Sequence, residues 1–442
     1  MVGRAERAAL DRLLDDRGVT PVFHPVVDLD TGDTVAYEAL ARGPRGTLLE
    51  RPDRLFALAR RVGRLDELDW LCRVSALRAA ADAGLRSPAT LFVNVEPATL
   101  GAPCPPGLRD DWERGAPGLR VVLEITERAV TARPAELLRV VEEARRRGWG
   151  IALDDVGADT RSLALLPFVR PDVVKLDLRL LHEQTTVGTA DIVNAVGAHA
   201  ERTGALVLAE GIETAGQADL ARAMGARLGQ GWLFGRPGPL PSPPSAPARG
   251  LPLAGAPHRP SGDTPYTVVA SSRPVRRADK SLLLTISRAL ESQAAGLGPT
   301  GVLLAAFQDV TRFGAATRVR YREMARRAAL VAAFGVGMDA QPLRSVRGAA
   351  LAADDALTGE WSVVLVGPHF AAALAAVDLG DDGPDERRRF DFVITYEREL
   401  VLAAAETLLA RVRSPAPRAS GTAGDGAVAV AGAQPGTRSA RV

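Results

Sequence analysis

Two apolar runs of the chain end in clustered carboxylates. The first, VLEITERAV, carries Glu124 and Glu127, and the second, IALDDVGAD, carries the adjacent pair Asp154 and Asp155. A carboxylate beside a buried apolar segment costs free energy unless a positive charge or a hydrogen-bond donor pairs with it. The two runs therefore predict a site where acidic groups meet a positively charged partner.

Other strand-like apolar runs end in polar groups as well. The complete set is Glu38, Asn94, Glu124, Asp154, Asp155, Lys175, Asp177, Glu210 and Gln230. Nearly all are oxygen donors and none is His or Cys, which favours a hard cation, Mg²⁺ or Mn²⁺, over zinc or copper. Adjacent aspartates that face a shared Glu and Asn could hold two metals about 3.5–4 Å apart, the geometry of phosphoester hydrolysis. For any single acid the alternative is a helix N-cap or a surface charge.

The rarity of two residue types points to the same site. Arginine supplies almost every cation of the chain, and the only lysines are Lys175 and Lys280. Lys175 interrupts the apolar run VVKLD, where its ammonium could position a water or stabilise charge on a phosphoryl oxygen; a structural pair with Asp177 is the alternative. Asn94 is one of two asparagines, and its amide oxygen could be a neutral metal ligand or simply belong to a turn.

The elements that must position these groups alternate between strand and helix from residue 19 to 235. The expected strands are 22–29, 34–42, 90–95, 119–125, 150–155, 172–177, 205–211 and 226–234, with helices at 55–84 and 134–148. Continuous apolar strands between amphipathic helices indicate a parallel sheet covered on both faces. Eight such strands predict a TIM-like (β/α)8 barrel, in which catalytic groups lie at the carboxyl ends of the strands. An open doubly wound sheet is the alternative, but no glycine-rich phosphate loop follows the first strand.

The rest of the chain predicts a second, smaller α/β domain. A segment rich in Pro and Gly, 238–262, reads as an extended linker, and the small-residue tail 413–442 as disordered. Between them, 263–412 shows strands at 300–308, 360–367 and 390–396 and helices at 278–296, 316–335 and 397–412. Residues 1–18 have a helical pattern, so the domain order is N-terminal helix, barrel at 19–237, linker, second domain and tail.

Composition excludes several classes of protein. A formal net charge of +2 argues against a nucleic-acid or membrane-surface partner. Cys72 and Cys104 form no disulfide framework, which favours a reducing compartment. There is no signal core and no apolar run of about 18 residues, so we expect a cytoplasmic protein without a membrane span.

The motifs at the strand ends resemble those of one family. In order they are YEALARGP, FVNVEP, LEITE, IALDDVG, VVKLD, AEGIE and GQGWLFGRP, over about half of the chain. This set is similar to the EAL-domain cyclic diguanylate phosphodiesterases. The resemblance implies a barrel that hydrolyses cyclic di-GMP to linear pGpG by attack of a metal-activated water, with Mg²⁺ or Mn²⁺ at a two-metal site. It also implies a homodimer through the barrel.

The resemblance assigns roles residue by residue. It makes Glu38, Asn94, Glu124, Asp154, Asp155 and Asp177 metal ligands and gives Lys175, Glu210 and Glu38 catalytic roles. Lys175 would orient the attacking water, and Glu210 would belong to the metal and water shell. Arg42, His24 and Gln230 would contact the substrate, Arg42 through a phosphate. Glu213 and Gln230 would support the site, and Glu127 would brace the loop after Asp155.

The chain departs from the family pattern at two positions. DDVGADT replaces the usual DDFGTG, with Val156 in place of Phe, in a loop linked to the second metal and to dimerisation. His24 replaces the Gln of FQPIV and would either face guanine or be a core residue. A catalytically silent cyclic di-GMP receptor is therefore the alternative function, and a pure interaction scaffold would leave the polar set unexplained. Because no metal-ligand position is lost, an active enzyme is favoured.

The second domain resembles the DICT sensory domain. The likeness lies in two stretches, one beginning GVLLAAFQDVTRFG and the other containing RRFDFVITYERELV. It implies regulation of the barrel by a signal that the resemblance does not identify.

Overall fold

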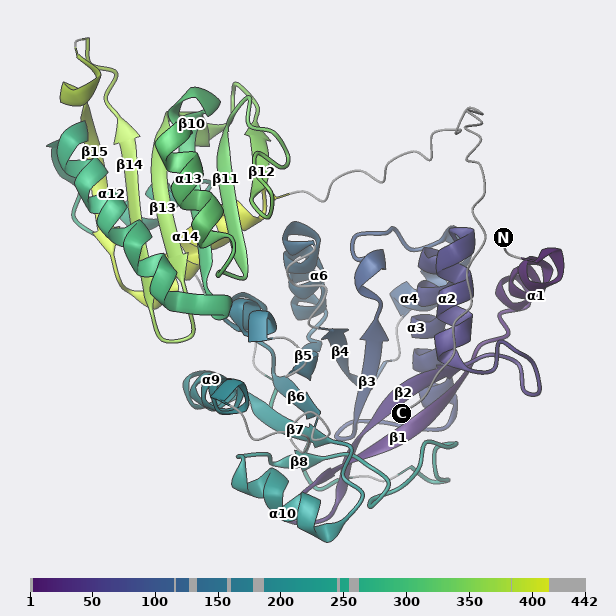
Figure 1. Ribbon diagram of the computed structural model, residues 1–442. Helices are drawn as coiled ribbons and strands as arrows, with labels where there is room; N and C mark the ends of the chain where they lie inside the picture. Colours follow the sequence, from purple (N-terminus) through teal and green to yellow (C-terminus); the bar gives the residue numbers. More distant parts are fainter. Residues whose placement is uncertain are drawn as a thin grey trace, which may run out of the picture.

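The structure of the protein is a computed structural model. It describes residues 3–114, 117–126, 133–156, 160–177, 187–244, 247–253, 262–382 and 384–412. Two regions, a barrel and a separate sheet with its own helices, are visible in Figure 1. Glu127 and the tail 413–442 lie outside the described residues.

The first region is a closed barrel in which the strands follow one another in sequence order. Its strands are β1 (Thr20–Asp28), β2 (Thr34–Arg42), β3 (Thr90–Val95), β4 (Arg120–Thr126), β5 (Gly150–Val156), β6 (Val173–Asp177), β7 (Leu206–Glu210) and β8 (Leu228–Gly229). This confirms the predicted barrel. Neighbouring strands from β2 to β8 are parallel, but β1 is antiparallel to both β2 and β8. The link between β1 and β2 is too short for the crossover helix that a parallel pair needs.

Helices surround the barrel. They are α1 (Arg4–Asp15), α2 (Pro52–Val62), α3 (Leu65–Asp82), α4 (Pro106–Arg114), α6 (Pro134–Arg146), α7 (Leu166–Val169), α9 (Val187–Thr203) and α10 (Ala215–Ala223). The single helix predicted for 55–84 is wrong, because Gly63 takes a φ of 74° and separates α2 from α3. A left-handed residue cannot continue an α-helix, and Gly adopts this conformation without steric cost.

The amino-terminal end of the barrel is filled by side chains. Val122, Ala152 and Val173 meet there, and Leu251, from the segment predicted as a linker, packs among them with 4% of its surface exposed. The Arg120 guanidinium donates a hydrogen bond to the Leu251 carbonyl. Part of the proline-rich segment thus closes this end, which leaves the carboxyl ends of the strands as the open face.

The second region is a mixed sheet with helices on both faces, which confirms the predicted α/β domain. The strand order is β12-β11-β10-β13-β14-β15-β9. The strands are β9 (Arg276–Asp279), β10 (Val302–Asp309), β11 (Leu330–Val336), β12 (Arg347–Leu351), β13 (Glu360–Val366), β14 (Ala371–Asp378) and β15 (Arg389–Thr395). The helices are α11 (Pro265–Ala270), α12 (Lys280–Ala294), α13 (Ala315–Met324) and α14 (Arg398–Leu409). β10, β11 and β12 are parallel, whereas β10 and β13 are antiparallel.

The sequence-based prediction of one long helix in this region is wrong. The helix predicted for 316–335 ends at Met324, and the run that follows forms β11, a central strand. A short continuous apolar run does not distinguish a buried strand from a buried helix. The strands β9, β12 and β14 were not predicted either.

The two regions are in contact through short helical elements. The 3-10 helix η2 (Thr160–Leu165) and α7 of the barrel lie against the 3-10 helix η3 (Ala295–Thr300) and α14 of the second region (Figure 1). Arg170 Nη1 donates to Glu399 Oε2 across this boundary at 2.8 Å. No helix in the described part of the chain is both long and apolar enough to cross a lipid bilayer.

Candidate active site at the carboxyl ends of the barrel strands

Lys175, on β6, lies at the centre of the barrel mouth. Its Nζ is 2.7 Å from Glu124 Oε1, 3.0 Å from Asp154 Oδ1 and 2.9 Å from Glu210 Oε1, and it is 3.7 Å from Glu38 Oε1. Only 1% of the Lys175 surface is exposed. The structure therefore brings one lysine from β6 together with acids from β2, β4, β5 and β7. The predicted alternative, a pair between Lys175 and Asp177 alone, does not describe this arrangement.

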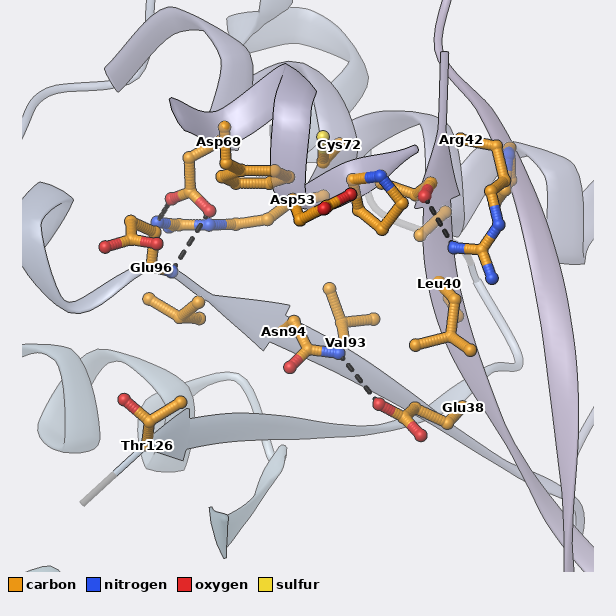
Figure 2. A pocket seen from close by; sticks show the side chains of 18 of the residues that line it. Glu38, Leu40, Arg42, Asp53, Asp69, Cys72, Val93, Asn94, Glu96 and Thr126 are labelled. Carbon is orange, nitrogen blue, oxygen red and sulfur yellow. Dashed lines mark hydrogen bonds and ion pairs between the residues drawn. The ribbon is translucent and has the colours of Figure 1, made fainter. Parts of the chain in front are cut away.

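Two amides orient the Glu38 carboxylate. Asn94 Nδ2 donates to Oε1 and Gln230 Nε2 donates to Oε2, each at 3.0 Å. Figure 2 shows the bond from Asn94, which comes from the neighbouring strand β3. Because both amide nitrogens face Glu38, the Asn94 amide oxygen points away from it, as a neutral ligand of a cation would require.

A second acidic group forms around the end of β5. Asp154, Asp155 and Glu210 each place one carboxylate oxygen within 4.8 Å of the oxygens of the other two. Asp155 has a φ of 57°, a left-handed conformation that is uncommon for residues other than Gly and often occurs at functional sites. Asp177 ends β6 opposite Glu210 in the strand register.

The mouth carries more negative charge than Lys175 can balance. Burial raises the pKa of Glu124 well above its usual value, with a further increase from the Glu38 charge. Burial also raises the pKa of Glu210, to about 8, although Lys175 opposes this. For Lys175, burial favours the neutral form, but the surrounding carboxylates outweigh it and its net pKa lies well above the usual value. The cluster therefore favours added positive charge.

The donor set fits a divalent cation. Glu124 Oε2 is buried without a hydrogen bond within the described part of the chain, whereas Lys175 Nζ contacts Glu124 Oε1 and Asp154 Oδ1. Buried carboxylate oxygens without hydrogen bonds are costly unless a cation contacts them. Carboxylate and amide oxygens are the ligands that Mg²⁺ and Mn²⁺ prefer.

A pocket of about 350 Å³ opens beside this cluster. Figure 2 shows Glu38 and Asn94 at one side of the pocket and Arg42 at its edge. Arg42 Nη1 donates a hydrogen bond to the backbone carbonyl of the preceding residue, Ala41, at 2.8 Å. Leu40 and Phe56 add apolar surface. The pocket thus combines an apolar wall and a guanidinium with the acidic mouth of the barrel.

One wall of the pocket is a buried network that the sequence analysis missed. Arg73 and Asp69, one turn apart on α3, form an ion pair, and Thr99 Oγ1 donates to Asp69 Oδ2 at 2.6 Å. Asp69 Oδ1 also accepts from the Glu96 backbone N–H at 3.1 Å. An Asp and an Arg four residues apart on the helix were the available signal. The network fixes α3 against the segment after β3.

His24 lies beside the cluster, opposite Glu38 in the register of β1 and β2, whereas Glu213 is on the exposed surface. His24 Nε2 is 3.1 Å from the Gly235 carbonyl, and burial lowers the pKa of this half-buried imidazole. Glu213 is exposed between β7 and α10. Glu127 cannot be placed, because it lies outside those residues.

Comparison with known families agrees with this geometry. The profile of the EAL domain matches residues 7–237, just over half of the chain. The chain belongs to the EAL domain family. Residues 267–379 match the profile of DICT, described as a sensory domain in diguanylate cyclases and two-component systems. Both resemblances inferred from the motifs are confirmed.

Individual relatives match the barrel region. The chain is 31% identical over 228 residues to the cyclic di-GMP phosphodiesterase NbdA of Pseudomonas aeruginosa, covering 49% of this chain and 29% of NbdA. It is 30% identical over 236 residues to the cyclic di-GMP phosphodiesterase RocR of the same species, covering 52% and 59%. A manganese and cyclic di-GMP complex of Klebsiella pneumoniae BlrP1 is 29% identical, with a TM-score of 0.44 over 50% of this chain and 56% of BlrP1. The chain thus spans less than two thirds of each of these proteins.

Proposed function

We propose that the barrel hydrolyses cyclic di-GMP to linear pGpG with Mg²⁺ or Mn²⁺ bound at its mouth. The observation that carries this proposal is the cluster of four carboxylates around the buried ammonium of Lys175, open to the pocket beside Glu38. The names of NbdA and RocR, both cyclic di-GMP phosphodiesterases, supply the substrate class. The homodimer expected from the resemblance is part of the proposal.

The site residues divide into three groups in this proposal. The cations would be held by Glu38, Asn94, Glu124, Asp154, Asp155 and Asp177. When bound, they would withdraw charge from the scissile phosphate and acidify a water. Lys175 would donate a hydrogen bond to that water between Asp154 and Glu210, both of which lie within 3.0 Å of its Nζ.

The remaining groups would bind and orient the substrate. Arg42 lies at the edge of the pocket, where its guanidinium could form two parallel hydrogen bonds with a phosphate. The pocket has the size of a small-molecule site, and its apolar wall suits the face of a base. Gln230 would act through Glu38, which it holds in place.

The second domain would regulate the barrel through the segment between β5 and β6. This segment starts after Asp155, includes η2 and α7, and leads to Lys175 on β6. The second domain contacts η2 and α7 through η3 and α14. A shift of this contact would therefore act on the two strands that carry Asp154 and Lys175.

The test is hydrolysis of cyclic di-GMP by the purified chain with Mg²⁺, with Mn²⁺ and with a chelator. We expect metal-dependent formation of pGpG, and a loss of at least about a hundredfold in Glu38→Gln, which keeps the shape of the side chain but removes its charge. Glu142→Gln, on the exposed face of α6, is the matched control and should keep full activity. Tight binding of cyclic di-GMP without turnover would replace the enzyme with the silent receptor, and absence of both would reject the proposal.

A further inference from the structure

The second domain contains a pocket of its own between α12, α13 and the sheet. Its volume is about 180 Å³. It lies at the carboxyl end of β10, and β10 is the strand that separates the parallel part of the sheet from the antiparallel part. In α/β sheets, ligands bind outside the carboxyl ends of strands where the order of the strands changes direction.

Aromatic rings form much of the wall. Phe307 comes from β10, Trp361 from β13 and Phe390 from β15, and Leu284 of α12 adds aliphatic surface. The rings of Trp361 and Phe390 pack edge to face, with centroids 5.9 Å apart. An apolar cavity of about 150 Å³ is enough to hold benzene. This pocket therefore has room for about one ring, which it can contact by stacking and edge contacts.

Positive charge dominates the polar part of the lining. The cations are Lys280, Arg288, Arg312 and Arg320, and the one acid among the lining residues is Glu291. Glu291 is 4% exposed and already engaged, because Arg320 Nε donates to Oε2 at 3.0 Å and the Tyr321 hydroxyl donates to Oε1 at 3.2 Å. Three lining cations thus remain beyond the acid that Arg320 balances.

Acids outside the lining balance part of this positive charge. Asp385, on the 3-10 helix η6 (Asp385–Arg387), pairs with Lys280 and with Arg312, the latter at 2.6 Å. Arg388 also approaches it, at 3.1 Å. Asp309 also lies 3.9 Å from Arg312, and Arg388 pairs with Asp378 as well. Arg288 has no ion-pair partner among the described residues, so the lining keeps an unbalanced positive charge there that attracts an anion.

Backbone strain marks the same pocket. Gln308 lines it and has a φ of 65°, which few residues other than Gly adopt. The register of β10 against β11 shifts at this point, between Ala306 and Asp309. The side-chain nitrogen of Gln308, Nε2, donates a hydrogen bond to Asp378 Oδ2 at 3.2 Å. Such a conformation persists only where the surroundings impose it, and it is common in ligand sites.

We propose that this pocket binds a single-ring aromatic carboxylate, with the ring between Phe307, Trp361 and Phe390 and the carboxylate toward Lys280, Arg288 and Arg312. The binding inference stands on the second domain alone and does not depend on the proposed phosphodiesterase activity.

One helix connects the pocket to the barrel. α12 supplies five lining residues, from Lys280 to Glu291, and leads directly into η3. η3 lies against η2, which follows Asp155 in the chain. Figure 1 shows α12 running from the far edge of the second domain toward the barrel. A ligand held along α12 is therefore placed to act on the segment between β5 and β6.

Ligand-observed NMR with the full chain tests the proposal, and benzoate is the probe. Cyclohexanecarboxylate keeps the charge and approximate size but lacks the π-face, and benzyl alcohol keeps the ring but lacks the charge. We expect benzoate to bind at millimolar or lower concentration and each analogue to bind at least about tenfold more weakly. Equal binding of cyclohexanecarboxylate and benzoate, or no binding of benzoate at millimolar concentration, would overturn the proposal.

Variants locate the binding. Arg312→Gln, on an accessible side chain, should weaken benzoate binding about tenfold, whereas Arg322→Gln, an exposed cation on α13 outside the pocket, should leave it unchanged. Trp361→Leu should weaken binding as well, and because Trp361 is the only tryptophan beyond residue 232, it should also abolish any quenching of tryptophan fluorescence by the ligand. Equal loss in Arg312→Gln and Arg322→Gln would show non-specific attraction and contradict the assignment.

Discussion

The barrel mouth and the pocket of the second domain hold charge clusters of opposite sign, the first buried and the second partly exposed. At the mouth, one cation, Lys175, lies among four carboxylates. In the pocket, one acid, Glu291, lies among four cations. In both regions the minority charge holds part of the cluster together, and in both proposals the unbalanced majority is what would meet a ligand. The comparison predicts a metal cation for the first region and an organic anion for the second.

The two lysines of the chain differ in burial, although each belongs to one of these clusters. The side chain of Lys175 is 1% exposed and that of Lys280 is 15% exposed beside an Asp385 that is 53% exposed. Removing a partner from a buried ion cluster is far more costly than removing one from a surface pair, because water cannot replace it.

The largest effect should therefore come from Lys175→Gln. In the absence of divalent cations we expect it to lower the free energy of unfolding of the barrel by about 3–5 kcal/mol. Lys280→Gln is the matched control, with a loss of at most about 1 kcal/mol. Urea unfolding with a chelator present measures both. Equal losses in the two variants would break the comparison between the regions.

A third buried titratable group, His199 on α9, lies between the two regions. Burial lowers its pKa to about 4, and the nearby charges of Arg202, Arg170 and Arg398 add to this effect. Since the folded-state pKa lies below the usual 6.5, the unfolded chain binds the proton more readily, and stability falls as pH decreases from about 6.5 to 4, by about 3 kcal/mol at most. His199→Leu should remove this part of the pH dependence. Thermal unfolding of the original chain and of His199→Leu is compared at pH 7 and pH 5. An equal decrease in melting temperature between the two pH values in both proteins would contradict the prediction.

Glu124→Gln should separate stability from function at the barrel mouth. Glu124 is completely buried and its pKa is raised well above the usual value, so a neutral amide should raise the metal-free stability by about 1 kcal/mol. The same change should remove the stabilisation that Mn²⁺ gives and the hydrolysis of cyclic di-GMP. Thermal unfolding with and without Mn²⁺ measures this, beside Glu142→Gln. If Mn²⁺ raised the melting temperature of Glu124→Gln as much as that of the original chain, Glu124 would not be a ligand.

The smallest effect should come from the ion pair between the regions. Arg170 and Glu399 are 2.8 Å apart, with side chains 26% and 44% exposed. Water and salt screen such a pair, so Arg170→Gln should cost less than about 1 kcal/mol. If thermal unfolding instead showed a loss as large as that of Lys175→Gln, the contact would be a rigid part of the fold rather than an adjustable boundary.

Part of the fold followed from local patterns. The bounds of β2 and β3 agree with the predicted strands 34–42 and 90–95, because each is a mainly apolar run with a clear end. The strand β14 was missed because its sequence, AAALAAVD, has a high helix propensity. Its neighbours β13 and β15 hold it in the sheet, and such tertiary contacts override propensity.

In the candidate site, too, local patterns predicted some features and tertiary packing decided others. The strand-end rule placed Glu38, Glu124, Asp154 and Lys175 at one mouth, and the structure brings them together. It did not reveal the Asp69–Arg73 network on the pocket wall, because that network depends on how α3 packs against the end of β3. Nor could it place His24 at the Gly235 carbonyl, more than two hundred residues along the chain.

Residue type and strand period were enough to predict a barrel with an acidic, oxygen-rich mouth around one rare lysine. These features arise within single strands, whose carboxyl ends must meet once the sheet closes. The pocket of the second domain was decided by tertiary structure, because its lining comes from α12, η4 (Val310–Arg312), α13 and three strands spread over more than a hundred residues. The contact of η3 with η2 was also decided there. No local pattern encodes which distant side chains share a cavity, since that depends on how complete elements pack.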